Sequence, residues 1–355
     1  MTLRPAGAPP ATPRLPDPTA LAEPATLAAV LGPVADVSAT RVETAGFSGS
    51  THTRLAVRLV NGHTRHLVLK RTRVADDWLS ARTGDRVGRE ALVLGEPALA
   101  SIWSAFASPY LAWSATDGQV ALLMEDLSAH LLPDVRQPIA EVDEDRLLAA
   151  AAAMHARFWE APALALTWLA RPAQLLDLLN VGTLDSLAAR GFPHPVVARA
   201  HAGWKVALAR APSRVVALLR EPPRSVAERG AGLPRTLTHG DLKVANFAWL
   251  PDGRVAAFDW AVIGACPVAI ELGWHLAVNA TRLPGTKEES IARYRRLLEA
   301  ALGHAPGELF WKQTVDYAVL AGATMMLWSK ALALEAGGPR AEQEWDWWVE
   351  RLAAL

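Results

Sequence analysis

The chain has 355 residues, of which 51% are hydrophobic, enough to fill one large domain or two lobes. Its 36 basic and 36 acidic residues cancel, so no overall charge favours nucleic acid or an anionic membrane as a partner. The single cysteine, Cys266, excludes an internal disulfide and a cysteine zinc cluster, and this composition favours a reducing, cytoplasmic location.

The N-terminal segment, residues 1–16, is expected to be a disordered leader, because "MTLRPAGAPPATPRLP" has many prolines and no apolar core of a signal peptide. No run of eighteen uninterrupted apolar residues predicts a membrane span. We therefore expect no nucleic-acid partner and no membrane partner, and the sequence leaves open whether the chain is a monomer or a homodimer.

Residues 17–126 predict a small β-rich lobe. After a short helix in "PATLAAVLGP", β-branched and alternating runs predict strands at 37–44, 54–60 and 65–70, and "NGH" at 61–63 predicts a hairpin turn. Helical spacing in "GDRVGREALVLGEPAL" then precedes two further strands, "YLAWSA" and "QVALLMEDL". The expected order is three strands, one helix and two strands.

Residues 127–355 predict a larger α-helical lobe. In "VDEDRLLAAAAAMHARFWE" the residues Leu147, Ala151, Met154 and Phe158 fall on one helical face, which should be buried. The C-terminal helices are rich in tryptophan, and most of these side chains are expected to fill the core. The five in question are Trp311, Trp328, Trp345, Trp347 and Trp348.

The stretch "LTHGDLKVANFAWLPDGRVAAFDW" concentrates polar residues around two short apolar runs. "PDGR" predicts a tight turn, so Asn246 and Asp259 should lie at the same end of a hairpin, with Asp241 just ahead of it. Phosphoryl transfer needs a carboxylate that deprotonates a hydroxyl, and oxygen ligands that hold magnesium against phosphates. Each acid taken alone could equally be an ordinary turn or strand end.

Together, "HGDLKVAN" and "FDW" resemble the catalytic loop and metal-binding Asp of the aminoglycoside phosphotransferase-like kinases, a small-molecule branch of the protein-kinase-like fold. The resemblance implies an α+β bilobal fold over about residues 36–300. It also implies that Asp241 is the catalytic base, that Asn246 and Asp259 bind Mg²⁺, and that His239 braces the loop. Lys243 occupies a position where protein kinases often carry a phosphate-contacting lysine.

The same fold requires a strand lysine that grips phosphates and a helix glutamate that orients it. Lys70 closes the apolar run "HLVLK", and Glu90 lies in the helix that follows. Lys70 could instead mark the point where its strand meets water. Glu96 is the weaker choice for the glutamate, since Pro97 ends the helix there.

Two further segments of the first lobe are expected to contact the nucleotide. The loop "AGFSGSTHT" can offer backbone N–H groups to phosphates, although it lacks a full glycine-rich signature. "LLMEDL" resembles the interlobe hinge that bonds a purine edge. The expected nucleotide contacts are Gly46, Ser48, Gly49, Ser50, Met124, Glu125 and Asp126.

Two further residues lie outside the catalytic loop motif. His155, in "MHARFW", is expected to be a packed, hydrogen-bonded histidine rather than a catalyst. Glu271 stands where the family often has an Asp, which puts its supporting role in doubt.

The resemblance implies an ATP- or GTP-dependent phosphotransferase that acts on a hydroxyl of a small molecule, such as an antibiotic, sugar, nucleoside or steroid-like metabolite. The alternative is a non-catalytic nucleotide-binding scaffold of the same fold. A hydrolase is not supported, because the sequence has no nucleophile elbow, His-Glu-x-x-His motif or Walker loop.

Overall fold

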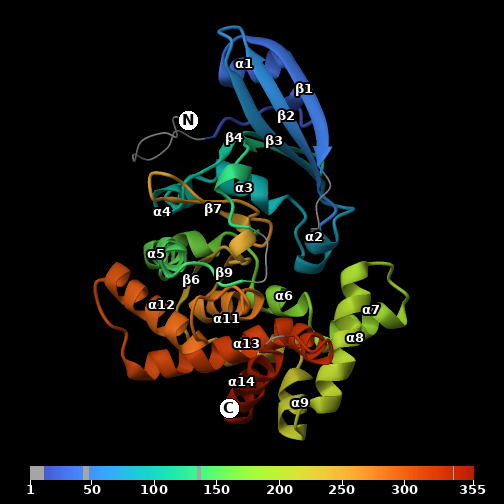
Figure 1. Ribbon diagram of the computed structural model, residues 1–355, viewed down its shortest axis with the longest axis vertical. Coiled ribbons are helices and arrows are strands. Elements are labelled where there is room, and N and C mark those ends of the chain that lie inside the picture. The colour runs from blue at the N-terminus through green and yellow to red at the C-terminus, as the bar shows by residue number, and fades with distance from the viewer. Residues whose placement is uncertain (1–11, 43–47, 134–136, 339) are drawn as a thin grey trace. The chain divides into compact units, whose positions relative to one another are not determined.

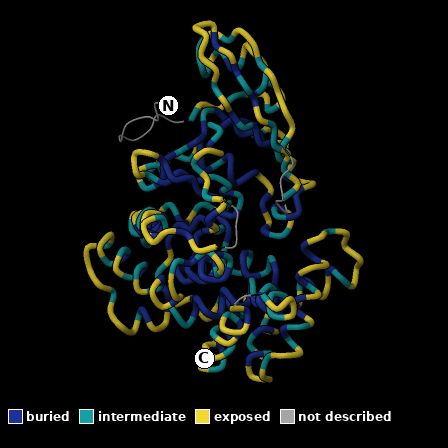
Figure 2. Tube along the Cα trace, in the orientation of Figure 1, coloured by how far each residue is buried: buried dark blue, intermediate teal, exposed yellow. Residues whose placement is uncertain are grey.

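The structure is a computed structural model that describes residues 12–42, 48–133, 137–338 and 340–355 (Figure 1). The chain divides into two compact units. Unit 1 comprises Met1–Pro133 together with Ala245–Ala261, and unit 2 comprises Asp134–Val244 together with Val262–Leu355. Both units have buried cores beneath exposed surfaces (Figure 2).

Unit 1 is built on a five-stranded antiparallel sheet with the order β1-β2-β3-β5-β4. The expected sequence of three strands, one helix and two strands is confirmed, with α3 as the main helix and the short α2 and α4 as additions. The elements are β1 (Val34–Val42), β2 (Thr51–Leu59), β3 (Thr64–Arg73), α2 (Trp78–Thr83), α3 (Arg89–Gly95), α4 (Ile102–Ala105), β4 (Tyr110–Thr116) and β5 (Gln119–Glu125).

The two faces of this sheet carry different side chains, because successive side chains of a strand point to opposite faces. On one face, Leu55 of β2 and Leu67 of β3 are fully buried in a core that includes Leu27 of α1 (Pro24–Leu31). The opposite face carries His52 and Lys70, which are directly paired in the β2–β3 register. Helix α3 packs against β4 and β5 (Figure 1).

The predicted hairpin around "PDGR" is confirmed as β7 (Phe247–Trp249) and β8 (Val255–Ala257). It belongs to unit 1 rather than to the expected lobe of residues 127–355. The backbone of Ala107 donates to Val255 over 2.8 Å and accepts from Ala257 over 3.3 Å, and the rings of Phe106 and Phe247 are 5.7 Å apart. These contacts join segments that are far apart in sequence.

The expectation of a disordered leader is wrong for residues 12–16, while residues 1–11 lie outside the described part of the chain. Leu15 donates its backbone N–H to Trp113 of β4 over 2.8 Å, and Trp113 donates to Pro13 over 3.1 Å. The Arg14 guanidinium lies 5.2 Å from the centre of the Trp113 ring. The edge strand β4 supplies hydrogen bonds that proline-rich composition does not reveal.

Unit 2 is mainly helical, as expected, and its core centres on α13, which packs against α8, α11 and α14 (Figure 1). A Cβ on Gly273 of α11 would lie 2.2 Å from the Ala318 carbonyl oxygen of α13, so glycine permits this close crossing. The helices are α5 (Glu141–Arg157), α6 (Pro172–Asp177), α7 (Val181–Ala189), α8 (Pro195–Arg210), α9 (Ser213–Leu219), α10 (Pro223–Arg229), α11 (Val268–Val278), α12 (Lys287–Leu302), α13 (Glu308–Glu335) and α14 (Ala341–Ala353).

The expected core positions of unit 2 are confirmed. The predicted face of α5 is buried, as are all the named tryptophans except Trp347, which is partly exposed. Helix α13 is long and apolar enough to span a membrane by length and composition, with a mean hydropathy of 1.3 in its most apolar window. Because 72% of that window is buried within the protein, a core helix explains it equally well.

Candidate active site

Lys70 lies at the centre of an ionic cluster in unit 1, in which Lys70 and Glu90 are buried and Asp259 is partly exposed. Its Nζ atom donates to Oε2 of Glu90 and to Oδ1 of Asp259, each over 2.7 Å. The Lys70 side chain is only 7% exposed, and β3 continues beyond it to Arg73. Lys70 therefore does not mark the point where the strand meets water.

The cluster keeps its ammonium group charged. Burial alone would lower the pKa of Lys70, but the carboxylates of Asp259 and Glu90 outweigh this effect and raise the pKa above its ordinary value. Burial raises the pKa of Glu90, and the Asp259 charge adds to that effect against the opposing influence of Lys70. With all three groups ionised, one cation faces two anions, so the cluster favours an added positive charge.

Glu90, rather than Glu96, holds the lysine. Besides Lys70, Glu90 accepts hydrogen bonds at Oε1 from the Tyr110 hydroxyl over 3.1 Å and from the Asp259 backbone over 3.2 Å. Glu96 instead caps a short 3-10 helix by accepting from the Ala98 backbone. Tyr110 was not singled out from the sequence, where it is an ordinary strand residue.

Asn246 and Asp259 lie at the same end of the β7–β8 hairpin. The Phe258 backbone N–H donates to the Asn246 carbonyl oxygen over 3.2 Å, next to the Phe247–Ala257 pair. Asp259 has a φ of 66°, a left-handed conformation that is rare for non-glycine residues and clusters at functional sites. Their side chains offer an amide oxygen and carboxylate oxygens, which fit the ligand chemistry of Mg²⁺.

The expected nucleotide loop is only partly described, since Gly46 lies outside the described residues. The Gly49 N–H donates to Oδ1 of Asp77 over 2.7 Å, and the Ser50 hydroxyl lies 2.7 Å from that of Thr72. Ser48 precedes them on the same loop. A phosphate at Gly49 would therefore compete with a carboxylate for the same N–H group.

The expected hinge segment, from Met124 to Asp126, lies at the end of β5. The Glu125 and Asp126 backbone N–H groups donate to Pro109 over 2.9 Å and to His66 over 3.0 Å. The Asp126 side chain accepts from Arg54 over 2.7 Å, and Glu125 pairs with Arg65. Because these N–H donors and carboxylates are already bonded within the protein, a purine at this segment would have to form hydrogen bonds with other groups.

The loop that follows β6 (Arg235–Thr238) positions Asp241 in unit 2. The indole N–H of Trp274, on α11, donates to Oδ1 of Asp241 over 2.7 Å, and the Asp241 backbone donates to Nδ1 of His239 over 3.3 Å. His239 is fully buried, whereas Lys243 is exposed. Nothing in the sequence motif pointed to Trp274, which lies 33 residues after Asp241.

Glu271 holds the backbone of this loop. It accepts from the N–H of Gly240 over 2.7 Å and from that of His239 over 3.1 Å. Gly240 has a φ of 84°, and a Cβ there would lie 2.2 Å from the Val262 carbonyl oxygen, so only glycine fits. The longer glutamate therefore supports the loop directly, which resolves the doubt about its role.

His155 is buried and hydrogen-bonded, as expected. Its Nε2–H donates to Glu271 over 2.7 Å, and its Nδ1 lies 2.7 Å from the Tyr294 hydroxyl oxygen. Burial alone would raise the pKa of Glu271, but the hydrogen bond and charge of His155, with smaller contributions from His239 and Gly240, hold the pKa below its ordinary value. Glu271 therefore stabilises the fold in its ionised form.

Glu271→Gln is expected to lower the free energy of unfolding by about 1–3 kcal/mol at pH 7, because buried hydrogen bonds to a charged group are weakened. Since the folded-state pKa is depressed, this contribution is present above the ordinary carboxyl pKa and disappears as the pH falls through the folded value. Denaturant unfolding should show the gap to the parent protein narrowing in acid. The exposed Glu228→Gln variant serves as the control.

Residues 44–310 match the family described as the phosphotransferase enzyme family, APH. The chain belongs to this family. The match covers Lys70, the loop that contains Asp241 and the β7–β8 hairpin in one span. No curated protein sequence matches the chain significantly. Family membership makes the chain a small-molecule phosphotransferase and confirms the expected protein-kinase-like fold class.

Solved structures that are similar to this phosphotransferase include three enzymes from bacteria. Choline kinase LicA from Streptococcus pneumoniae is 13% identical, with 93% of this chain and 97% of that chain covered and a TM-score of 0.46. Macrolide 2'-phosphotransferase MphH from Brachybacterium faecium is 19% identical, with coverage of 90% and 95% and a TM-score of 0.45. An aminoglycoside phosphotransferase from Alicyclobacillus acidocaldarius is 15% identical, with coverage of 89% for both chains and a TM-score of 0.39.

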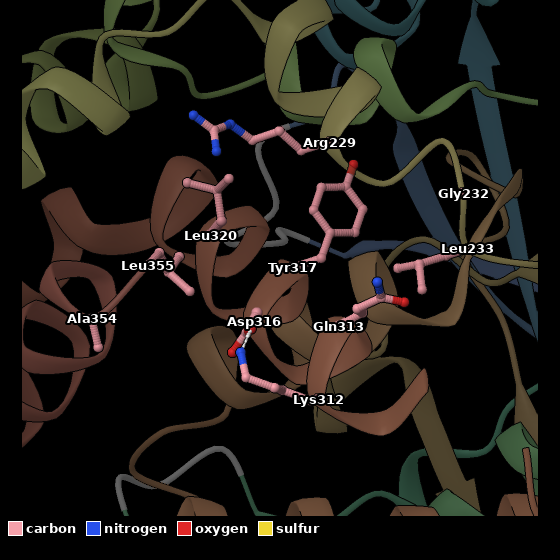
Figure 3. A pocket seen from close by; sticks show the side chains of 10 residues that line it. All are labelled: Arg229, Gly232, Leu233, Lys312, Gln313, Asp316, Tyr317, Leu320, Ala354 and Leu355. Carbon is pink, nitrogen blue, oxygen red and sulfur yellow. Dashed lines mark hydrogen bonds and ion pairs between the residues drawn. The ribbon is translucent and has the colours of Figure 1, made fainter. Parts of the chain in front are cut away.

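The phosphotransferase also has a pocket of about 300 Å³ in unit 2 that contains none of the expected site residues (Figure 3). Tyr317 and Lys312 of α13 line it together with Arg229. Lys312 pairs with Asp316 over 2.6 Å, and Arg229 pairs with Glu221. These charges are already neutralised within the protein, so the pocket does not identify a second ionic site.

Proposed function

We propose that this phosphotransferase transfers the γ-phosphate of ATP or GTP to a hydroxyl group of a small molecule. The observation that carries the proposal is the Lys70–Glu90–Asp259 cluster, in which both contacts of Nζ are 2.7 Å. In this role Lys70 binds the α- and β-phosphates and Glu90 orients it. Ser48, Gly49 and Ser50 would contribute phosphate contacts, and the segment Met124–Asp126 would contact the purine.

In the proposed reaction, Asp241 accepts the proton of the acceptor hydroxyl. The hydroxyl oxygen forms a bond to the γ-phosphorus as the bond from that phosphorus to the β,γ-bridging oxygen breaks. The products are a phosphate monoester, the nucleoside diphosphate and a proton held first by Asp241. The Trp274 indole holds one carboxylate oxygen, and the buried His239 braces the loop. The exposed Lys243 contacts the transferred phosphate in this proposal.

Asn246 and Asp259 are the residues that would hold Mg²⁺. When bound, the ion would neutralise charge on the phosphate oxygens. Lys70 already spans from Glu90 to Asp259, so the protein places its own cation beside the carboxylate that is proposed to bind the metal. The cytoplasm, where ATP, GTP and Mg²⁺ occur together, remains the proposed location.

A transfer assay tests the proposal against the non-catalytic alternative. The chain is incubated with Mg²⁺ and γ-labelled ATP or GTP, together with panels of hydroxylated antibiotics, nucleosides, sugars and steroids. Label on an acceptor supports the kinase. Nucleotide at 100 times its dissociation constant should add about 2.7 kcal/mol to stability. If nucleotide stabilises the protein but no acceptor receives the label, the result favours a non-catalytic scaffold. If nucleotide does not stabilise the protein, the result counts against both the kinase and the scaffold.

Trp274→Phe is expected to lower kcat about tenfold with little change in the KM for nucleotide. Phenylalanine keeps the aromatic packing but removes the N–H that donates to Asp241, and a hydrogen bond to a charged group contributes about 1.5–3 kcal/mol. Steady-state kinetics with a saturating acceptor would measure kcat and the nucleotide KM separately. An equal rise in nucleotide KM, or an unchanged kcat, would contradict a role in positioning Asp241.

A further inference from the structure

His52 lies beside the nucleotide lysine on the same face of the sheet. In the antiparallel β2–β3 pair, His52 is directly opposite Lys70. Side chains directly opposite each other share a face, with Cβ atoms about 4.5–5.5 Å apart. The His52 ring therefore stands next to the ionic cluster of unit 1, immediately after the loop that contains Ser50.

The His52 ring lacks the hydrogen bonds that its neighbours have. Its Nδ1 atom is buried without a partner, and within the described residues no hydrogen bond is made by the ring. On the same face, Ser50 contacts Thr72 over 2.7 Å and Arg54 pairs with Asp126 over 2.7 Å. Since buried polar groups are nearly always satisfied, an unpartnered imidazole here needs an explanation.

The surroundings of His52 favour its neutral form. Burial lowers the pKa of His52, and the Lys70 charge lowers it further, with Asp259 acting in the opposite direction. A neutral imidazole has one N–H donor and one acceptor. The donor suits an anionic oxygen, and it adds no further positive charge beside Lys70.

We propose that His52 is a nucleotide-binding residue whose ring N–H donates a hydrogen bond to a phosphate oxygen of the nucleoside triphosphate held by Lys70. This inference rests on the proposed function, in which Lys70 binds the α- and β-phosphates. A role in packing alone does not account for the residue, because a leucine would fill the space without burying an unpartnered nitrogen.

The experiment measures dissociation constants of Mg·ATP, Mg·ADP and adenosine, or of the guanine series, by calorimetry. His52→Leu removes the donor, and His52→Gln restores one on a side chain of similar reach. His63→Leu, an exposed histidine in the β2–β3 turn, is the control. Thermal melting of each variant reports whether the fold is intact.

His52→Leu is expected to weaken binding of both phosphorylated ligands about tenfold, as for one hydrogen bond to a charged group. Adenosine binding and the His63→Leu variant should be unchanged, and His52→Gln should recover part of the loss. Unchanged Mg·ADP affinity in folded His52→Leu, or an equal loss for adenosine, overturns the inference while leaving the proposed function intact. Failure of the parent chain to bind any nucleotide overturns both.

Discussion

Asp241→Asn is expected to lower kcat by about 10²–10⁴-fold, the range typical of losing a positioned general base. The amide cannot take the proton of the acceptor hydroxyl at neutral pH. Nucleotide affinity should stay close to that of the parent protein, because the Lys70–Glu90–Asp259 cluster is held entirely by residues of unit 1. Single-turnover transfer and nucleotide titration would measure the two quantities separately.

The Asp241→Asn variant is chosen because it disturbs little else. The Asn side-chain oxygen can still accept from the Trp274 indole, and the backbone bonds of Gly240 and His239 to Glu271 do not involve the substituted side chain. An unchanged melting temperature would verify the fold. A kcat within about threefold of the parent value would mean that Asp241 is not the base, since base catalysis contributes at least about 10²-fold.

Asp259→Asn is expected to lower turnover by a factor on the order of 10³, because metal-assisted charge stabilisation supplies several kcal/mol. The Mg²⁺ concentration needed for half-maximal activity should also rise, since a neutral amide binds Mg²⁺ more weakly than a carboxylate. Nucleotide binding measured with and without Mg²⁺ should lose most of its dependence on the metal. This pattern separates Asp259 from Asp241, whose substitution should leave the Mg²⁺ requirement unchanged.

Asparagine is the suitable replacement because, like Asp, it tolerates the left-handed backbone that Asp259 adopts, with a φ of 66°. Lys70 keeps its bond to Glu90 in the variant. Asp252→Asn, in the turn of the same hairpin, is the matched control, because Asp252 pairs with Arg254 at the surface. An unaltered Mg²⁺ dependence in Asp259→Asn would remove Asp259 from the metal site.

Local patterns predicted the elements that hold the candidate site. Alternation located the strands around Lys70, and the helical segment after it placed Glu90 within reach, where the structure has the two side chains 2.7 Å apart. The turn "PDGR" predicted the hairpin, whose second strand ends two residues before Asp259. Composition misjudged residues 12–16, because their hydrogen bonds are made with β4 rather than within the segment.

The contacts that support the site residues could not be predicted from sequence patterns. Tyr110 reaches Glu90 from β4, and Trp274 reaches Asp241 from α11, each across a separation that has no fixed spacing in the chain. The doubt over Glu271 arose from comparing residue types at one position. It was resolved only by the two backbone N–H groups that the longer side chain meets.

The amino-acid sequence by itself determined the α+β class, the order of the strands and the residues of the motif, because these depend on alternation, turn chemistry and short spacings. Only the tertiary structure decided that the β7–β8 hairpin belongs with the sheet of unit 1, and that Lys70 is shared between two carboxylates. Only the tertiary structure showed that Nδ1 of His52 has no hydrogen-bond partner among the described residues. The physical reason is that buried polar groups must be satisfied by whatever packing brings near them, and packing joins residues that are far apart in sequence.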